Sequence, residues 1–328
     1  MSGQVTIVMY HYIRELTHSR YPEIKGLEIH KFKEQLAYIL KYYHIITASE
    51  LLAAVDSAGD LPRNAALLTF DDGYVDHYTN VFPIIEKHKI QGCFFPPPAA
   101  IMKHKVLDVN KIHFILAAIK DKSSIIKKIF SMMDELRAGY SLRSNADYYA
   151  EFAVANRFDP APVAFIKRLL QTELPECVRS MIIDDLFSSF VTSDEQAFSQ
   201  ELYMSVDQLQ CLQRHGMYIG SHGYNHYWLD HLDGEKQEEE INSSLEFLKI
   251  LGGDVNKWIM CYPYGVYNES LLDLLKRKGC QVGLTTRVDL ARLDLDNPLT
   301  LPRLDTNDLP KKGDARPNDW TLQAAAAS

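Results

Sequence analysis

Two adjacent carboxylates and a glycine follow an apolar run in the segment Thr69-Phe70-Asp71-Asp72-Gly73. The run at 65–70 predicts a buried strand, so the two acids stand at the end of that strand. Consecutive side chains of a strand point to opposite faces, so both acids can serve one site only if the chain turns, which Gly73 permits. Neighbouring carboxylates repel unless a cation or a shared proton relieves them. The pair therefore indicates a bound metal, although Asp-Asp-Gly alone is also typical of an Asx-type turn or a helix cap.

Two histidines stand four residues apart in Ser221-His222-Gly223-Tyr224-Asn225-His226, after a second predicted strand at 217–221. Their imidazoles can converge on one ion if the segment winds as a helical turn. Taken alone, the pair is equally typical of surface or core histidines. Together with Asp72, however, His222 and His226 form a facial set of one oxygen and two nitrogens. Such a set leaves positions open for water and substrate, as a catalytic divalent metal requires.

These residues must be positioned by an alternation of strands and helices. Predicted strands lie at 5–10, 65–70, 92–96, 217–221, 258–262 and 281–285. Amphipathic helices are predicted at 32–43, 81–89, 234–251 and 269–278, and Gly279 follows the last of them as a C-cap residue would. This alternation predicts a parallel sheet with helices outside, in which active sites gather at the C-terminal strand ends.

The stretch from about 101 to 200 interrupts the alternation, because its pattern is almost wholly helical. We therefore predict a barrel domain at 1–100 and 201–310, a helical insertion at 101–200 and a tail at 311–328. An insertion beside an open metal position would narrow access to it. This arrangement favours a small or chain-terminal substrate.

Composition limits the partners and the compartment. The formal net charge of -8 argues against nucleic acid, and no apolar run approaches the roughly 20 residues that cross a bilayer. The first residues lack the pattern of a secretory signal. The five cysteines are widely spaced and odd in number, which predicts reduced thiols that act as small core residues. A cytoplasmic location is expected.

Three ordered motifs, at 69–73, 222–226 and in Tyr262-Pro263-Tyr264-Gly265, resemble those of the polysaccharide deacetylases, family 4 of the carbohydrate esterases. The resemblance covers 1 to about 100 and 201–305. It implies an α/β fold, a distorted (β/α) barrel of about seven strands. It also implies that a divalent metal is bound, Zn²⁺ before Ni²⁺, Co²⁺, Mn²⁺ or Fe²⁺.

The same resemblance assigns roles to single residues. Asp71 would be the catalytic base, and Asp72, His222 and His226 would hold the metal. The backbone N–H of Tyr264 would donate to an oxyanion. A Lewis acid that polarises an amide and acidifies a water, beside a carboxylate that takes the water's proton, is consistent with these roles.

The sequence departs from the family pattern in the residue that acts as general acid. Family members often have a histidine near the C-terminus in this role. No histidine follows His231 here. A Tyr-His pair near the N-terminus is found in the similar biofilm poly-N-acetylglucosamine deacetylases, and Tyr10-His11 matches it. We predict His11 as the general acid, with a structural histidine as the alternative, and Asp289 or Asp305 as residues that could orient it.

A second departure concerns the partner of the base. The family usually carries an arginine two residues before the proline of its third motif, and Cys261 stands there instead. Arg303, in Leu301-Pro302-Arg303, and Arg287 are the candidates to replace it. The alternative for Arg303 is a surface charge.

The sequence thus predicts a metal-dependent hydrolase that removes an N-acetyl group from an acetamido sugar, in surface-polysaccharide or lipopolysaccharide biosynthesis. The substrate would be a nucleotide-linked sugar, a lipid-linked sugar or an oligosaccharide. Two alternatives remain open. One is a non-catalytic glycan-binding protein on the same fold, and the other is a hydrolase of another C–N bond, such as a sugar formamide.

Overall fold

The computed structural model describes residues 3–56, 61–156 and 159–326. The chain divides into two compact units, and the larger contains Met1–Glu15, Gly26–Lys103 and Gln200–Ser328. The smaller contains His104–Ser199 and also Leu16–Lys25, a segment that lies within the sequence range predicted for the barrel. In the described residues, no helix combines the length and the apolar character needed to cross a membrane.

The larger unit is built on a seven-stranded sheet and a two-stranded sheet. Its strands are β1 (Gln4–Tyr10), β2 (His44–Ile45), β3 (Ala65–Asp71), β4 (Cys93–Phe95), β5 (Tyr218–Ile219), β6 (Trp258–Cys261), β7 (Cys280–Leu284), β8 (Ala291–Arg292) and β9 (Leu304–Asp305). Strand β3 is buried along its whole length between β1 and β4. Such a strand has both faces covered, which explains its unbroken apolar pattern.

Most strand pairs are parallel, as the alternation of elements predicted. The parallel pairs are β1 with β3 and β9, β2 and β4 with β3, β4 with β5, and β6 with β7. Only β8 pairs with β1 in the antiparallel sense among the described strands. Isolated bridges from Ser221 to Met260 and from Leu284 to Leu301 connect the two sheets. The predicted α/β class is confirmed.

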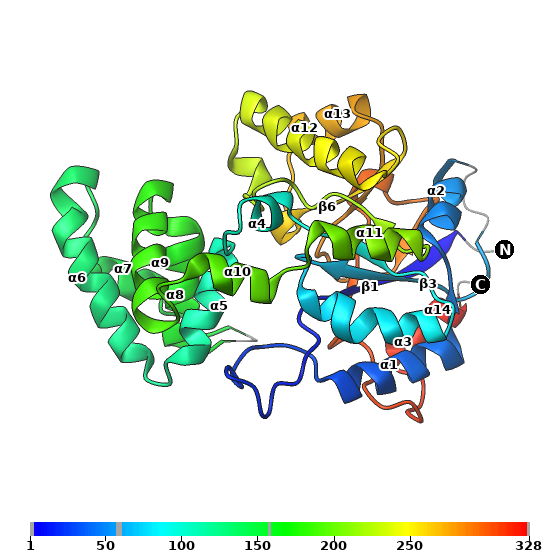
Figure 1. The fold of residues 1–328 in the computed structure, drawn as a ribbon, viewed down its shortest axis with the longest axis horizontal. Coiled ribbons are helices and arrows are strands. Elements are labelled where there is room, and N and C mark those ends of the chain that lie inside the picture. The colour runs from blue at the N-terminus through cyan, green and yellow to red at the C-terminus, as the bar shows by residue number, and fades with distance from the viewer. Residues whose placement is uncertain (1–2, 57–60, 157–158, 327–328) are drawn as a thin grey trace. The chain divides into compact units, whose positions relative to one another are not determined.

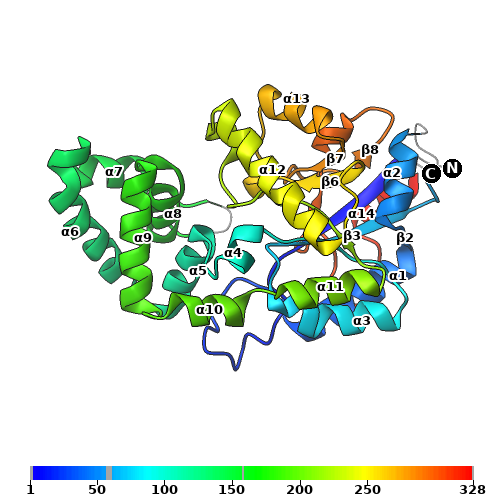
Figure 2. The same ribbon diagram turned by 45° about the horizontal axis from the view of Figure 1, so that its top comes forward.

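Helices flank these sheets, and in both views α13 lies on one side of β1 and β3 while α1 and α3 lie on the other (Figure 1, Figure 2). The helices of this unit are α1 (Ile29–Tyr42), α2 (Ala48–Asp56), α3 (Phe82–Lys87), α4 (Pro98–Met102), α11 (Val206–Arg214), α12 (Gly234–Leu251), α13 (Glu269–Arg277) and α14 (Asp319–Ala326). A π-helical segment, His77–Val81, precedes α3, and short 3-10 segments lie at Leu229–His231, Pro263–Gly265 and Pro298–Thr300.

The smaller unit is mainly helical in its described residues at 104–199, whereas its segment Leu16–Lys25 forms turns and loop. It contains α5 (Asp108–Ala118), α6 (Lys122–Tyr140), α7 (Asn145–Phe152), α8 (Ala161–Arg168), a π-helical segment (Leu169–Glu173) and α9 (Glu176–Phe190), and α10 (Glu195–Leu202) leads from it into the larger unit. Phe114, Phe187 and Phe198 pack edge to face, with ring centroids 4.8 and 5.3 Å apart. Lys111 is buried beside them and pairs with Asp184 and Glu195, which satisfies its charge.

Two sequence predictions about the periphery are wrong. Residues 311–328 are not simply a tail, because α14 forms there and its buried Thr321 hydroxyl bonds to the hydroxyls of Tyr38 and Tyr43 at 2.7 and 2.8 Å. The last two residues, 327–328, lie outside the described ranges. The five cysteines are free thiols, but Cys177 is exposed and Cys211 only half-buried, so not all of them are core residues.

Candidate active site

The two adjacent carboxylates occupy the C-terminal end of β3. Asp71 is the last residue of the strand, and Asp72 already has a left-handed backbone with φ of 70°. The turn therefore begins one residue before Gly73, whose own φ is 67°. A Cβ at Gly73 would lie 2.8 Å from the Cβ of Pro96, so both the backbone and the space require glycine there. This turn brings both acids to one site.

The two histidines lie on a loop after β5, so they do not need the helical turn that was the condition for their convergence. Gly223 and His226 both have positive φ values, 67° and 60°, which a helix does not allow. The loop is held instead by Glu240 of α12, whose buried carboxylate accepts hydrogen bonds from the backbone N–H groups of Tyr224 and Asn225 at 3.0 and 2.9 Å. The side-chain amide of Asn225 donates to the same carboxylate. Hydrogen bonds to the carboxylate of Glu240 therefore hold this loop, in place of the backbone hydrogen bonds of a helical turn.

Asp72, His222 and His226 converge. The Nε2 atoms of both imidazoles lie 3.3 Å from Oδ1 of Asp72, and all three side chains are buried. This oxygen has no hydrogen-bond partner among the described residues. The Nδ1 of His222 lies 2.7 Å from the carbonyl oxygen of Cys261 and must donate to it, which leaves Nε2 as a lone-pair ligand. One carboxylate oxygen and two imidazole nitrogens fit a divalent cation such as Zn²⁺.

The protonation state of Asp72 suits a metal ligand. Burial raises the pKa of Asp72, but the imidazoles of His222 and His226 outweigh burial and hold the pKa well below its ordinary value. The side chain is therefore a carboxylate at neutral pH, which is the form that ligates cations.

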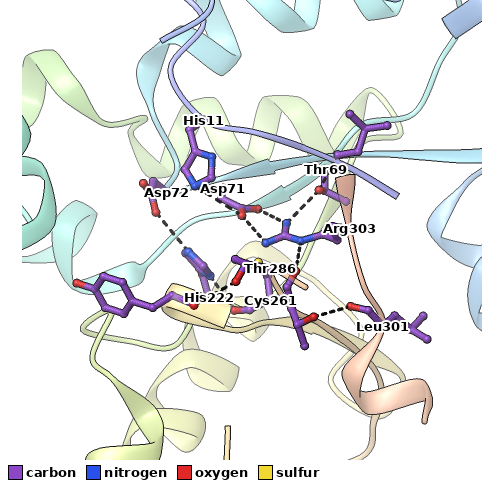
Figure 3. Close-up of polar contacts among 12 residues, drawn as sticks. His11, Thr69, Asp71, Asp72, His222, Cys261, Thr286, Leu301 and Arg303 are labelled. Carbon is purple, nitrogen blue, oxygen red and sulfur yellow. Dashed lines mark hydrogen bonds and ion pairs between the residues drawn. The ribbon is translucent and has the colours of Figure 1, made fainter. Parts of the chain in front are cut away.

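Arg303 lies against Asp71, as the sequence predicted for one of its two candidate arginines. Its Nη2 is 2.8 Å from Oδ2 of Asp71 and its Nη1 is 3.0 Å from Oδ1, so the pair is bidentate (Figure 3). The same guanidinium donates to the carbonyl of Thr285 and the hydroxyl of Thr69. Both partners are buried, so every charge is compensated inside the protein. Arg287 instead pairs with Asp296 and Asp289 at the surface.

This ion pair sets the charge of Asp71. Burial raises the pKa of Asp71, but the charge of Arg303, followed by those of His11 and His222, outweighs burial and lowers the pKa below its ordinary value. Asp71 is thus ionised. The sulfur of Cys261 forms a second group with Asp71 and His222, within 4.8 Å of one another. The guanidinium already bound to Asp71 makes that group a poorer cation site than the one at Asp72.

His11 follows β1 and faces the same carboxylate. Its Nε2 lies 3.9 Å from Oδ2 of Asp71, and 41% of its side chain is exposed, so its ring is open to solvent (Figure 3). The buried ring of His77 contacts the carbonyl oxygen of His11 through Nε2 at 2.9 Å. Burial lowers the pKa of His77 to about 4, so this neutral imidazole must donate to the carbonyl and thereby holds the backbone of His11.

The two acids predicted as residues that could orient His11 have other partners. Asp289 pairs with Arg287, and Asp305 accepts hydrogen bonds from the backbone and side chain of Asn307. The carboxylate beside the His11 ring is that of Asp71.

Tyr264 is also in a left-handed conformation, with φ of 58° and ψ of 1°. Its ring stacks on Trp228, with centroids 4.0 Å apart and planes at 7°, and meets the edge of His226 at 4.9 Å. Its carbonyl accepts a hydrogen bond from the Thr286 hydroxyl. Three residues of this site, Asp72, His226 and Tyr264, thus hold a backbone conformation that L-residues avoid and that recurs at functional sites.

Sequence reasoning missed the residues that support these side chains. Tyr74 donates a hydrogen bond to Asp72. Its position two residues after Asp72 was the only feature of the sequence that could have indicated this contact. His77 lies on the first turn after the acid pair, but nothing in the sequence indicated its contact with His11. Glu240 stands on an amphipathic helix among other acids, where a surface role was the natural interpretation.

We expect Glu240→Gln to destabilise the folded chain by about 2 kcal/mol, because the amide cannot accept all the N–H groups that the carboxylate accepts. Urea unfolding of both proteins measures the difference. Glu239→Gln, an exposed neighbour on α12, is the matched control and should change stability by less than about 0.5 kcal/mol. Equal unfolding midpoints for the two variants would contradict a supporting role of Glu240.

Known proteins share this fold. The match to Bacillus subtilis YxkH, a relative whose name also assigns it to the polysaccharide deacetylases, is 29% identical over 92 residues, 28% of this chain and 33% of that protein. Two solved structures superpose over most of the chain. The deacetylase PplD of Streptococcus pyogenes, in complex with acetate, has a TM-score of 0.55 at 16% identity over 93% of each chain. IcaB from Ammonifex degensii has a TM-score of 0.56 at 18% identity over 99% of this chain and 97% of that one.

The two structures establish the fold, since their sequence identities to this chain are low. The family assignment comes from the polysaccharide deacetylase model, which matches residues 58–133 and 187–283. Because these residues make up more than half of the 328, the chain belongs to the polysaccharide deacetylase family.

Proposed function

We propose that this protein is a metal-dependent N-deacetylase that hydrolyses the acetamido group of a sugar to acetate and a free amine. The observation that carries the proposal is that two adjacent acids have different partners. Asp71 is ionised and held by Arg303, while Asp72 turns one oxygen toward two imidazole nitrogens. A general base beside a set of metal ligands can catalyse the hydrolysis of an unactivated amide.

Asp72, His222 and His226 would hold the cation, and Zn²⁺ suits their mixture of oxygen and nitrogen best, with Ni²⁺, Co²⁺, Mn²⁺ and Fe²⁺ as the other candidates. When bound, the cation supplies a Lewis acid that polarises the amide carbonyl and acidifies water. Because Asp72, His222 and His226 are buried, bulk water is kept away from their ligand atoms, which strengthens the electrostatic interactions of those atoms.

The chain's own residues account for the proton transfers. Asp71 takes a proton from the attacking water as its oxygen bonds to the carbonyl carbon, and negative charge develops on the carbonyl oxygen. The backbone N–H of Tyr264 donates to that oxygen in this proposal, and one such donor typically contributes about 3 kcal/mol. His11 then protonates the nitrogen as the C–N bond breaks, so an amine leaves rather than an amide anion.

Arg303 bears on the alternative of a glycan-binding protein without turnover. Two departures from the family pattern favour that alternative: Cys261 stands where the family usually has the arginine partner of the base, and no histidine follows His231. A guanidinium nevertheless reaches Asp71 in bidentate geometry, from a different segment. The geometry therefore supports catalysis.

The substrate class is the next part of the proposal. An acetamido sugar is favoured because the family name specifies polysaccharide deacetylation and because the structural relative PplD was solved with acetate, the product expected here. Whether the sugar is nucleotide-linked, lipid-linked or part of an oligosaccharide is for experiment to decide. The role in surface-polysaccharide or lipopolysaccharide biosynthesis and the cytoplasmic location stay predictions.

The direct test is acetate release from a panel of acetamido sugar nucleotides, glycolipids and oligosaccharides by the Zn²⁺-loaded protein. We expect release with one class, and we expect Asp71→Asn to lower turnover by about 100-fold or more while Zn²⁺ stays bound. Asp72→Ala and His222→Ala should lose the metal as well, because they remove ligands. Bound zinc is measured after dialysis by elemental analysis.

Several outcomes would count against this proposal. Metal loss in all three variants alike would refute the separate roles of Asp71 and Asp72. No acetate from any substrate class, with metal bound, would favour the glycan-binding alternative. Mass analysis that identified formate as the released acid would instead favour a sugar formamide hydrolase.

We expect His11→Ala to slow an amide substrate by about 100-fold or more, yet to slow an activated acetyl ester far less. The reason is that the leaving group of such an ester departs without a proton. His30→Ala, which removes an exposed histidine on α1, is the control. Initial rates on both substrates decide the matter, and a uniform slowing of amide and ester by His11→Ala would refute the role of general acid.

We expect Arg303→Gln to move the acidic limb of the pH profile of kcat/KM to higher pH. The base must be ionised to act, and without the guanidinium the effect of burial on Asp71 dominates and raises its pKa. Activity would therefore disappear sooner as the pH falls. Arg287→Gln removes a half-exposed arginine that pairs elsewhere and should leave the profile unchanged. An unshifted limb in folded Arg303→Gln would contradict the assignment.

A further inference from the structure

The second oxygen of Asp72 is already occupied. While Oδ1 lies 3.3 Å from both imidazole nitrogens, Oδ2 accepts a hydrogen bond of 2.5 Å from the hydroxyl of Tyr74. Both groups are buried, so water does not compete for this bond. The two oxygens of one carboxylate thus face different partners.

Tyr74 is itself fixed by packing and by backbone pairing. Its ring is fully buried and stacks on Tyr12, with centroids 4.0 Å apart and planes at 22°. An isolated antiparallel bridge joins Tyr74 to Tyr203, whose ring is nearly parallel to its own. Because the ring is packed on these sides, its hydroxyl cannot move far from Asp72 without repacking of the neighbouring rings.

The packing extends one layer further. The guanidinium of Arg14 lies over the ring of Tyr12, 4.9 Å from its centroid, and forms an ion pair of 2.6 Å with the buried Asp76. Tyr12 is therefore covered on both sides. The hydroxyl of Tyr74 is held in place by a stack of side chains rather than by one contact.

A carboxylate that ligates a cation can rotate about its terminal torsion, which is a soft degree of freedom. A hydrogen bond to one oxygen removes that freedom and determines which oxygen is presented to the ion. Partners of this kind typically change metal affinity by about 10–100-fold when they are removed. His222 has such a partner in the carbonyl of Cys261, and Asp72 has one in Tyr74.

We propose that Tyr74 is a positioning residue that orients Asp72 so that Oδ1 alone faces the cation between His222 and His226. This inference rests on the metal site of the proposed function. It adds a residue outside the three ligands that determines how tightly the metal is held.

The test compares Tyr74→Phe with Tyr10→Phe in the full chain. Both changes delete one hydroxyl from a fully buried tyrosine, but the hydroxyl of Tyr10 has no hydrogen-bond partner among the described residues. Zn²⁺ affinity is measured on metal-free protein by competition with a chromophoric chelator at fixed pH. We expect Tyr74→Phe to raise the Kd by about 10-fold or more and Tyr10→Phe by less than about twofold. The melting temperature of the metal-free protein, measured for each variant, separates loss of affinity from loss of structure.

The outcomes are distinguishable from failure of the proposed function. Wild-type protein that binds no Zn²⁺ would overturn the metal site itself. Wild-type binding with an unchanged Kd in folded Tyr74→Phe would overturn the role of Tyr74 alone. Replacement of Tyr74 by 4-aminophenylalanine keeps the buried ring and a donor at its far end, and it keeps the test decisive if the phenylalanine variant does not fold. We expect the Kd of this variant to be within about 10-fold of wild type, and a loss of about 100-fold in the folded variant would refute the proposal.

Discussion

The structure depends on the burial of two adjacent carboxylates at the end of one strand. Asp71 and Asp72 are 1% and 4% exposed, and two neighbouring negative charges in such surroundings repel strongly. Each acid has its own compensation. Arg303 balances Asp71 within the chain, whereas Asp72 faces two imidazoles and has one oxygen that accepts no hydrogen bond from the described part of the chain. This difference in surroundings suits Asp71 to the proposed role of base and Asp72 to that of metal ligand, although the two are neighbours in sequence.

The same constraint explains why the backbone is strained where the chemistry lies. Asp72, His226 and Tyr264 all have positive φ values, at a cost of about 1–2 kcal/mol each. Each is held by a neighbour that has no part in the reaction. Gly73 packs on Pro96 beside Asp72, Glu240 binds the loop before His226, and Trp228 stacks on Tyr264. Surrounding structure of this kind keeps such conformations in place.

Much of this arrangement could be predicted from the sequence, because it follows from local pattern. Alternating strands and helices placed the segments at 71–72 and 222–226 at strand ends, and parallel strands bring such ends together. Contacts that depend on distant residues were not accessible in that way. The helical turn considered for 222–226 is absent because Glu240, on a later helix, supplies the hydrogen bonds that a turn would have made. Thr321 forms hydrogen bonds with Tyr38 and Tyr43, which lie 283 and 278 positions earlier in the sequence.

Arg303 connects the charge of Asp71 to the pairing of strands β9 and β1. Cys261 ends β6 and, like Asp71, interacts with the guanidinium of Arg303. Arg303 immediately precedes β9, and β9 pairs with β1, the strand that leads to His11. The charge of Asp71 therefore depends on correct pairing of β9 with β1. The ionisation of Asp71, the proposed base, and the placement of His11 are coupled in this way, because one strand pair positions both Arg303 and His11.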